Sequence, residues 1–425
     1  MQIIPHVTDE TKRFIRKNAE KTKADIVITE IGGTIGDIES RHFLEAIRQF
    51  SFDVGRENCC FIHVCLVPYI TGSNEYKSKP TQHSVNELQG IGITPDVIVL
   101  RSDGPVGEEI KRKIARFCNV DADCVVSDIT LKCLYDTPVA LHKEGLDKAV
   151  ARKLKLGGRI DLKEWRAFLK SVKSAKKTVD IALVGKYVTL HDAYLSVAEA
   201  LNAGGYACGA RVNIRWVDSE TVTAQTAPVI FAGVGGIIIP GGFGNRATEG
   251  MIQSCRYARE NDIPCLGICL GMQMMAIEFA RDVCGLKGAT SGEFEPQSDC
   301  KIIDLMNDQK NIENMGGTMR LGAYDCVLKP GSAVYAMYSR PQIAERHRHR
   351  YEFNNAYREI FEQNGMSLCG QSPDGKLVEI MELPGKSFYV GCQFHPEFKS
   401  RPDEAHPLFA EFVKKSVQHS MEINK

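Results

Sequence analysis

A cysteine stands where a short apolar run ends and a helical pattern begins. Cys269 follows the apolar residues 264–268, and residues 274–280 have the pattern of a helix. The neighbouring Gly267 and Gly271 allow a tight turn with positive φ and leave room beside the sulfur. A helix that starts at this point turns its positive end toward the sulfur and favours the thiolate. These residues predict a strand, a sharp turn and a helix, with a nucleophilic thiol at the turn.

A nucleophilic cysteine needs a base that takes its proton and a group that orients this base. His395 and Glu397 follow an apolar strand predicted at residues 387–394. Residues two apart in an extended chain face the same side, and Pro396 biases His395 toward an extended conformation. His395 can therefore act as the base, with Glu397 as its orienting acid. A loop histidine capped by its own neighbour is the alternative.

A nucleophile of this kind also needs hydrogen-bond donors for an oxyanion. Residues 240–244, Pro-Gly-Gly-Phe-Gly, follow another apolar strand and leave their backbone N–H groups uncovered by side chains. Gly242 and Leu270 can supply the two donors. A glycine-rich turn would explain any one of these segments, but not why all three follow predicted strands in one half of the chain.

Length and composition bound the class of protein. A chain of 425 residues with 43% hydrophobic and 25% charged residues is typical of a globular protein of two or three domains. Its 53 basic and 53 acidic residues give no bulk electrostatic case for binding nucleic acid or a membrane surface. There is no apolar run long enough for a transmembrane helix. The 15 cysteines lack repeated C-x-x-C pairs, which argues against a disulfide framework and indicates buried thiols in a reducing compartment.

The first half of the chain has an α/β pattern. We expect helices at residues 42–48 and 106–117. Strands are predicted at residues 24–30, 60–67, 95–101 and 124–127. Continuously apolar strands such as 60–67 indicate a parallel sheet that is covered on both faces.

Two polar segments of this half are candidates for a site. Glu30, Asp37 and Glu39 surround a glycine-rich turn after the first predicted strand, where open α/β sheets bind ligands and magnesium. A tight turn with acids that cap the next helix is the alternative, and the chain has no Walker A motif. Residues 76–84 read as a polar loop with two lysines. It can hold a polyphosphate, although composition alone favours a solvated surface loop.

The second half repeats the α/β pattern after a joint. Residues 140–178 are amphipathic and lysine-rich, with Gly157 and Gly158 between two helical stretches. A helix is predicted from residue 194 to the pair Gly204–Gly205. Strands are predicted at residues 179–185, 212–217, 234–240, 264–268, 376–382 and 387–394. Strands that alternate with helices indicate a doubly wound parallel sheet.

The motifs P-G-G-F-G, G-I-C-L-G-M-Q and F-H-P-E, in this order, resemble class I glutamine amidotransferases over residues 178–425. By this resemblance Cys269 attacks the carboxamide of glutamine, His395 shuttles the proton and Glu397 orients His395. Residues 316–322, 346–352 and 291–294 are similar to the amidotransferase domain of CTP synthases. That similarity implies a set of positions that bind glutamine or the oxyanion formed from it: Gly242, Leu270, Gly271, Met272, Gln273, Glu293 and Arg350. Of these, Gln273, Glu293 and Arg350 would hold the α-amino and α-carboxylate groups of glutamine.

The first half resembles the synthetase domain of the same family through E-I-G-G-T-I-G-D-I-E-S and K-S-K-P-T-Q. The resemblance implies a P-loop-NTPase-like domain in which Glu30 binds Mg²⁺. The implied UTP or CTP site is Asp37, Ile38, Glu39, Lys77, Ser78, Lys79, Pro80, Thr81, Gln82 and Lys113. The domains expected are a synthetase domain at 1–150, a linker at 151–177 and an amidotransferase domain at 178–425.

The implied reaction converts UTP, ATP and glutamine into CTP, ADP, phosphate and glutamate. The family further implies Mg²⁺ with ATP and no organic cofactor, CTP as feedback inhibitor, GTP as activator, a homotetramer and a cytoplasmic location. No nucleic-acid or membrane partner is expected.

One departure leaves alternatives open. In CTP synthases a segment before the motif at Glu30 carries a glycine-rich, lysine-containing phosphate loop, and Met1 begins downstream of it. We therefore expect an N-terminally incomplete synthetase domain, as a fragment, a mispredicted gene start or a truncated variant. The alternatives are a glutaminase that only supplies ammonia or hydrolyses γ-glutamyl substrates, and a non-catalytic module that binds nucleotide or joins an assembly of intact relatives.

Overall fold

The computed structural model describes residues 1–305 and 319–423, which form two compact units, 1–169 and 170–425. The division lies within helix α7 (Lys163–Ser174). Of the motif at residues 316–322, positions 316–318 fall outside the described residues. In the described part of the chain, no helix has both the length and the apolar composition needed to cross a bilayer.

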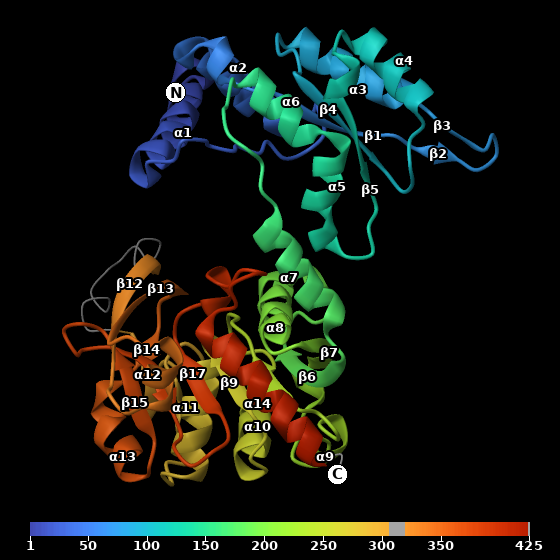
Figure 1. Ribbon diagram of the computed structural model, residues 1–425. Helices are drawn as coiled ribbons and strands as arrows, with labels where there is room; N and C mark the ends of the chain where they lie inside the picture. Colours follow the sequence, from blue (N-terminus) through green and yellow to red (C-terminus); the bar gives the residue numbers. More distant parts are fainter. Residues whose placement is uncertain (306–318, 424–425) are drawn as a thin grey trace. The chain divides into compact units, whose positions relative to one another are not determined.

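The first unit is built on a three-stranded parallel sheet in the order β1-β4-β5 (Figure 1). These three strands are β1 (Ile62–Leu66), β4 (Val97–Ser102) and β5 (Val125–Ile129), and a separate antiparallel pair is formed by β2 (Tyr69–Ile70) and β3 (Glu75–Tyr76). Its helices are α1 (Thr8–Thr22), α2 (Arg41–Val54), α3 (Lys79–Gly90), α4 (Glu108–Cys118), α5 (Thr137–Glu144) and α6 (Leu146–Lys153). Side chains of α3 and α4 pack on one face of this sheet, and α6 packs on the other. The predicted parallel sheet is confirmed. The prediction that its strands are covered on both faces is wrong for β1, because Ile62, Val64 and Leu66 are 44%, 61% and 65% exposed.

Two other predictions for this unit are wrong. Residues 24–30 do not form a strand but an exposed extended segment, and Ile28 is 93% exposed. Val and Ile favour strands only where a neighbouring strand pairs with them, and this segment lies in none of the sheets of the described residues. The loop predicted at 76–84 is wrong for most of its length: Tyr76 ends β3, and residues 79–84 begin α3, with Pro80 in its first turn, where proline is tolerated.

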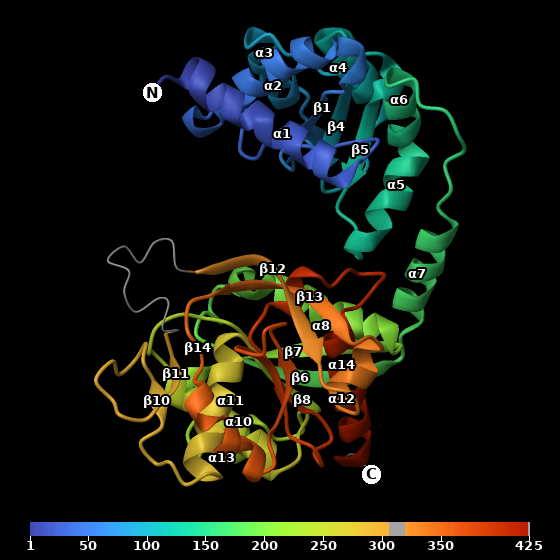
Figure 2. The ribbon, with the colours of Figure 1, turned by 90° about the vertical axis from the view of Figure 1, so that its left-hand side faces the viewer.

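The second unit is organised around a nine-stranded sheet in the order β13-β12-β15-β16-β17-β9-β8-β6-β7 (Figures 1 and 2). The five strands from β17 to β7 are parallel, and the other four are antiparallel. These nine strands are β6 (Lys177–Gly185), β7 (Ala210–Asp218), β8 (Gly236–Ile239), β9 (Cys265–Ile268), β12 (Arg320–Leu328), β13 (Gln342–His349), β15 (Ser367–Gln371), β16 (Val378–Glu382) and β17 (Tyr389–Cys392). A small second sheet contains β10 (Thr290–Ser291), β11 (Lys301–Asp304) and β14 (Glu352–Phe353).

Helices cover both faces of the large sheet, as a doubly wound fold requires (Figure 2). One apolar core takes side chains from α9 (Ala227–Ile230), α10 (Thr248–Glu260), α11 (Leu270–Asp282) and α13 (Arg358–Gln363). The opposite core takes them from α8 (Leu195–Ala207), α12 (Ala333–Tyr338) and α14 (Pro407–Ile423). Helix α8 ends at Ala207, shortly after the pair Gly204–Gly205 where its end was predicted. Both glycines are packed tightly, Gly204 against Phe409 and Gly205 against Ala210.

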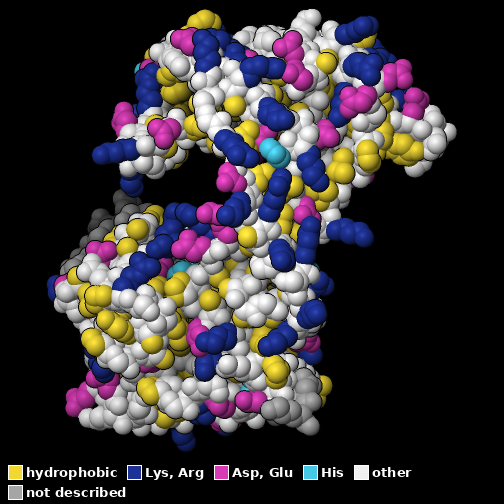
Figure 3. Space-filling view, in the orientation of Figure 1, with side chains coloured by type: hydrophobic (Ala, Val, Ile, Leu, Met, Phe, Trp, Pro, Cys, Tyr) yellow, Lys and Arg dark blue, Asp and Glu magenta, His cyan; other side chains and the backbone are white. Residues whose placement is uncertain are grey.

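Charged side chains of both signs lie on the surface, in keeping with the zero net charge of the sequence. Basic and acidic groups both occur across the visible face of each unit (Figure 3). All fifteen cysteines lie within the described residues. Each of them is a free thiol, in keeping with the prediction from their spacing.

Candidate functional site

The carboxyl ends of three neighbouring parallel strands bring the candidate catalytic segments together. Strands β17, β9 and β8 lie side by side, with Cys392 opposite Ile268 and Gly267 opposite Ile239. Each strand is followed at once by one candidate segment. The segments that contain the histidine, the cysteine and the glycine-rich turn therefore share one edge of the sheet, as expected for a ligand site in an open α/β fold.

Cys269 occupies the sharp turn between β9 and α11. Its φ of 52° and ψ of −103° are strained for a residue with a side chain. Two glycines beside the turn allow its neighbours to pack closely, because glycine has no Cβ. A Cβ on Gly271 would lie 2.0 Å from the Ile239 carbonyl oxygen, and a Cβ on Gly267 would lie 2.4 Å from Met275 Sδ. The predicted strand, turn and helix are confirmed, including the positive φ.

We expect Gly271→Ala to destabilise the second unit. The added methyl would meet backbone rather than a flexible side chain, so α11 must move away from β8. Overpacking of this kind costs on the order of 3 kcal/mol in the free energy of unfolding. Urea denaturation measures this loss, with Gly288→Ala as the control, because a Cβ at Gly288 meets nothing within 4 Å. A free energy of unfolding equal to that of the control would contradict this packing.

His395 and Glu397 lie next to Cys269 and contact each other. His395 Nδ1 and Glu397 Oε1 are 2.7 Å apart, and both side chains are largely buried. The His395 backbone N–H donates to the Arg346 carbonyl at 2.8 Å, which fixes the segment. A Cβ on Gly241 would lie 3.0 Å from His395 Cε1 and 3.7 Å from Cys269 Cβ, so a glycine at this position leaves room for both side chains.

The charges around His395 favour its protonated form. Burial alone would lower the pKa of His395, but the Cys269 sulfur and the Glu397 carboxylate raise it to about 10. At neutral pH the imidazole therefore carries a proton that it can deliver to a leaving nitrogen. Because Nδ1 is engaged by Glu397, Nε2 is the nitrogen left for the thiol and the substrate.

We expect Glu397→Gln to move the alkaline limit of glutaminase activity to lower pH. In the parent chain, kcat/KM for glutamine should fall as pH rises through about 10, where His395 loses its proton. Removing the carboxylate lowers the pKa of His395, so this limb shifts toward neutrality and activity at pH 7 falls roughly 100-fold. The profile of kcat/KM from pH 6 to 10.5 measures both effects. An unchanged alkaline limb would show that Glu397 does not control the proton on His395.

The glycine-rich turn lies beside the start of α11, as an oxyanion site requires. A Cβ on Gly242 would lie 3.2 Å from Leu270 Cδ2. The first N–H groups of a helix have no partner within the helix, so those of Leu270 and Gly271 are suited to bind an anion at this point. Gly242 and Leu270, the residues expected to donate, thus lie beside each other.

Lys186, which follows β6, supports this turn and was missed in the sequence. Its side chain is buried, and Nζ donates to the carbonyls of Phe243 (3.1 Å) and Gly244. Arg246 Nη2 in turn donates to the Lys186 carbonyl at 2.7 Å. Burial lowers the pKa of Lys186 to about 8. A lysine directly after the apolar run of residues 179–185 was the available signal.

The residues expected to bind glutamine lie around the same edge. Glu293 Oε1 accepts from the Gly244 N–H at 2.8 Å, so this carboxylate reaches the glycine-rich turn. Gln273 is 4% exposed, and its Nε2 donates to the Tyr351 carbonyl at 3.2 Å. Arg350, beside Tyr351, is half-buried. Met272 is buried with its side chain against Gly391, so only its backbone is available to a substrate.

The basic run at residues 346–350 is only partly a surface feature. Strand β13 alternates, so that His347 and His349 are buried while Arg346 and Arg348 are exposed. The sequence alone allowed a surface basic run, but the alternation places imidazoles inside the unit.

A buried polar cluster contains these two histidines. Arg320 Nη1 contacts Glu379 Oε1 at 2.8 Å and Glu352 Oε1 at 3.3 Å. His347 Nδ1 and His349 Nε2 are 2.8 Å apart. Burial and the neighbouring Glu379 raise the pKa of Glu352 to about 8, and burial and Arg320 lower the pKa of His347 to about 3. His347, His349 and Glu379 have the chemistry of metal ligands, but the guanidinium of Arg320 already supplies the positive charge at Glu379.

The candidate nucleotide residues of the first unit lie in two segments, residues 30–39 and the region of α3 and α4. Glu30, Asp37, Ile38 and Glu39 are exposed, and Asp37 Oδ2 accepts from the Thr34 N–H at 3.2 Å, in keeping with the turn alternative. Among the described residues, no hydrogen bond or ion pair joins this segment to α3, but Ile31 and Ile35 pack in the same apolar cluster as Leu88 of α3. Around the start of α3 and on α4, the expected residues are Lys77, Ser78, Lys79, Pro80, Thr81, Gln82 and Lys113.

Three of these side chains hold the start of α3 instead of facing solvent. Ser78, Thr81 and Gln82 are buried. Gln82 Nε2 donates to Ser78 Oγ at 3.2 Å, and Thr81 Oγ1 donates to the Leu66 carbonyl at 3.3 Å. Lys79 and Lys113 are exposed, and Lys77 pairs with Glu75. The ammonium groups of Lys79 and Lys113 are therefore the positive charges that remain available to phosphates.

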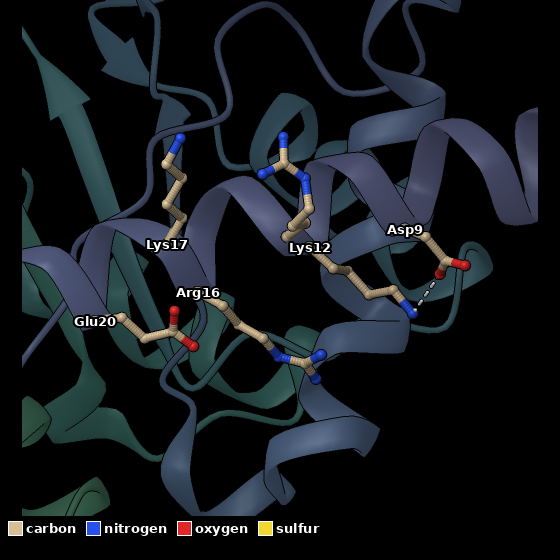
Figure 4. Close-up of a pocket in the computed structure, with 6 residues that line it drawn as sticks. Asp9, Lys12, Arg16, Lys17 and Glu20 are labelled. Atoms are coloured by element: carbon tan, nitrogen blue, oxygen red, sulfur yellow. Dashed lines mark ion pairs between the residues drawn. The ribbon is translucent and has the colours of Figure 1, made fainter.

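A charged pocket on α1 contains none of the candidate residues (Figure 4). It is lined by Asp9, Lys12, Arg13, Arg16, Lys17 and Glu20. Lys12 pairs with Asp9 at 3.0 Å and with Asp53 at 3.2 Å, and Arg16 also pairs with Asp53 at 3.1 Å. These acids neutralise much of the basic charge, so nothing points to a bound anion.

Comparison with known proteins identifies relatives for both units. Residues 1–156 match the family model described as CTP synthase N-terminus, and residues 189–415 match that described as Glutamine amidotransferase class-I. CTP synthase of Clostridium acetobutylicum is 52% identical over 97% of this chain and 78% of its own length. That of Halalkalibacterium halodurans is 53% identical over 98% and 79%. The solved glutaminase domain of Trypanosoma brucei CTPS with bound acivicin is 36% identical, with a TM-score of 0.54 over 56% of this chain and 94% of that chain.

Proposed function

Because the chain belongs to the CTP synthase family, we propose that it aminates UTP to CTP with ATP and with ammonia released from glutamine. The match of residues 1–156 to the CTP synthase N-terminus supports the amination half of this proposal. The observation that carries the glutamine-hydrolysing half is the set formed by Cys269, His395 and Glu397 at the edge of one sheet. Cys269 provides the nucleophile, His395 the proton carrier and Glu397 the orienting acid, and His395 interacts with both of the others.

The glutaminase half-reaction follows from this geometry. Cys269 Sγ attacks the side-chain carbonyl carbon of glutamine, and the electron pair moves onto the oxygen that faces Gly242 and Leu270. When the C–N bond breaks, the proton on His395 passes to the nitrogen and ammonia leaves. Water then attacks the thioester carbon, gives a proton to His395, and the C–S bond breaks to release glutamate.

Glutamine itself is held by charge complementarity. We propose that Glu293 receives the α-ammonium and Arg350 the α-carboxylate, because carboxylate and guanidinium groups form strong charge-assisted hydrogen bonds. Gln273 uses both amide hydrogens inside the protein, on Tyr351 and Gln393, so its Oε1 is the atom free to accept from the ammonium.

The synthetase half-reaction is assigned to the first unit. ATP phosphorylates O4 of the uracil ring, and ammonia displaces that phosphate to give CTP. We propose that Lys77, Lys79, Lys113 and the N-terminus of α3 attract the nucleotide phosphates. Mg²⁺ usually takes one or two carboxylates together with substrate phosphates, and the exposed carboxylate of Glu30 fits such a role. The metal would neutralise phosphate charge during transfer.

Regulation, assembly and location are proposed from family membership. They comprise CTP as feedback inhibitor, GTP as activator, a homotetramer and a cytoplasmic site of action. The cysteines are free and most of them are buried, which is consistent with a reducing compartment.

Transfer of the amide nitrogen tests the proposed function. The chain is incubated with [amide-¹⁵N]glutamine, UTP, ATP and Mg²⁺, and CTP is analysed by mass spectrometry. We expect CTP that carries one ¹⁵N, dependent on ATP. Glutamate release without labelled CTP would contradict the proposal and leave a glutaminase that only supplies ammonia.

A further inference from the structure

We propose that Gln393 is a further catalytic residue, whose side-chain amide donates a hydrogen bond to Cys269 Sγ and stabilises the thiolate. This inference rests on the proposed role of Cys269 as nucleophile. Gln393 directly follows β17 and is completely buried. Its Nε2 lies 3.6 Å from Cys269 Sγ, within the range of hydrogen bonds to sulfur.

A chain of hydrogen bonds fixes the orientation of this amide. The Tyr351 carbonyl can only accept, so Gln273 must turn Nε2 toward it, at 3.2 Å. The second hydrogen on the same nitrogen meets Gln393 Oε1, also at 3.2 Å. Gln393 must therefore present Nε2, and not its oxygen, to Cys269 Sγ. The orientation follows from an obligatory acceptor at the end of the chain.

The backbone holds Gln393 in place. Its N–H donates to the Glu379 carbonyl at 2.8 Å, and the Cys269 N–H donates to the Cys392 carbonyl at 2.7 Å. The strand end that carries the donor and the turn that carries the sulfur are thus joined by a backbone hydrogen bond one residue away. Because the side chain has no contact with solvent, water does not compete for the donor.

A neutral donor at this position complements His395. A thiolate is an acceptor only, so an N–H fixed beside the sulfur favours it over the thiol. The amide does not titrate, whereas His395 loses its proton near pH 10. The same donor also serves the second half-reaction, because the electron pair of the C–S bond returns to Sγ when water cleaves the thioester.

Gln393→Met tests the proposal, because methionine fills a similar volume without a donor. We expect kcat/KM for glutamine to fall about 10- to 100-fold, the effect of losing one hydrogen bond to a charged group. A purely structural role would also lower activity. The diagnostic readout is therefore the rate of Cys269 alkylation by iodoacetamide as a function of pH, followed by peptide mass spectrometry. We expect its inflection to move up by about one pH unit.

Two further variants keep the test decisive. Gln371→Met is the matched control, since Gln371 is a half-buried glutamine of β15 that donates to the Leu368 carbonyl; its alkylation profile should equal that of the parent. If Gln393→Met does not fold, Gln393→Asn takes its place. Asparagine keeps a neutral amide, but its side chain is one methylene shorter and draws the donor away from the sulfur, so the inflection should again rise.

An alkylation inflection within about 0.3 pH unit of the parent in a folded variant would overturn the role of Gln393. Failure of the nucleophile role proposed for Cys269 is a separate result, because it would appear as glutamine hydrolysis that persists in Cys269→Ala.

Discussion

Cys269→Ala is expected to abolish glutamine hydrolysis, with a fall in kcat of about 10⁴- to 10⁶-fold. Alanine removes the only atom that can form the thioester, and the oxyanion donors and glutamine-binding groups alone leave little catalysis. The cavity left by one sulfur atom is small, so the second unit should remain folded. Glutamate release, measured with an excess of the variant, gives the residual rate.

The same variant separates the two half-reactions. If the first unit uses free ammonia, Cys269→Ala should still make CTP when ammonium chloride replaces glutamine. Cys208→Ala is the control, because Cys208 is a half-buried thiol of the same unit, outside the catalytic set. Loss of the ammonia-dependent reaction in Cys269→Ala, but not in the parent, would contradict the division of labour between the units.

His395→Asn should have the second largest effect, a fall in kcat of about 10⁴-fold. The variant loses both the group that pairs with the thiolate and the acid that protonates the leaving nitrogen. Glutamine binding depends on other residues, so KM should change much less than kcat. Steady-state kinetics at pH 7 separates the two parameters.

A second signature belongs to the same variant. Without the imidazolium, alkylation of Cys269 by iodoacetamide should require higher pH. His419→Asn, on α14, is the control for loss of a histidine in this unit. A large fall in kcat with an unchanged alkylation profile would show that His395 does not act on the thiol and would limit its role to proton transfer.

The catalytic set could be predicted because its residues follow apolar strands directly. In a parallel sheet the strand ends meet at one edge, so Cys269, His395 and the turn at 240–244 had to lie near one another. Gln393 stands in the same segment as His395 and Glu397, and residues two apart face the same side. That spacing was a usable signal for its position. Its hydrogen bond to sulfur depends on Gln273, 120 residues away, and no local pattern contains it.

The errors in the fold have a common physical cause. Residues 24–30 have strand-forming side chains, but a strand exists only with a partner, and pairing is a property of the tertiary structure. The start of α3 was hidden because Thr81 and Gln82 are polar residues that are buried through hydrogen bonds, one to Leu66 of β1 and one to Ser78. The buried histidines of β13 were likewise concealed within a run of arginines.

Covalent trapping on Cys269 tests most directly whether this cysteine makes the ammonia. The chain is mixed with [¹⁴C]glutamine, quenched in acid within milliseconds and digested, and the labelled peptide is identified. We expect one base-labile label on the peptide that contains Cys269, and none in Cys269→Ala. Glutamate formed at the full rate with no label on Cys269, or with the label on another residue, would contradict the assignment of the nucleophile.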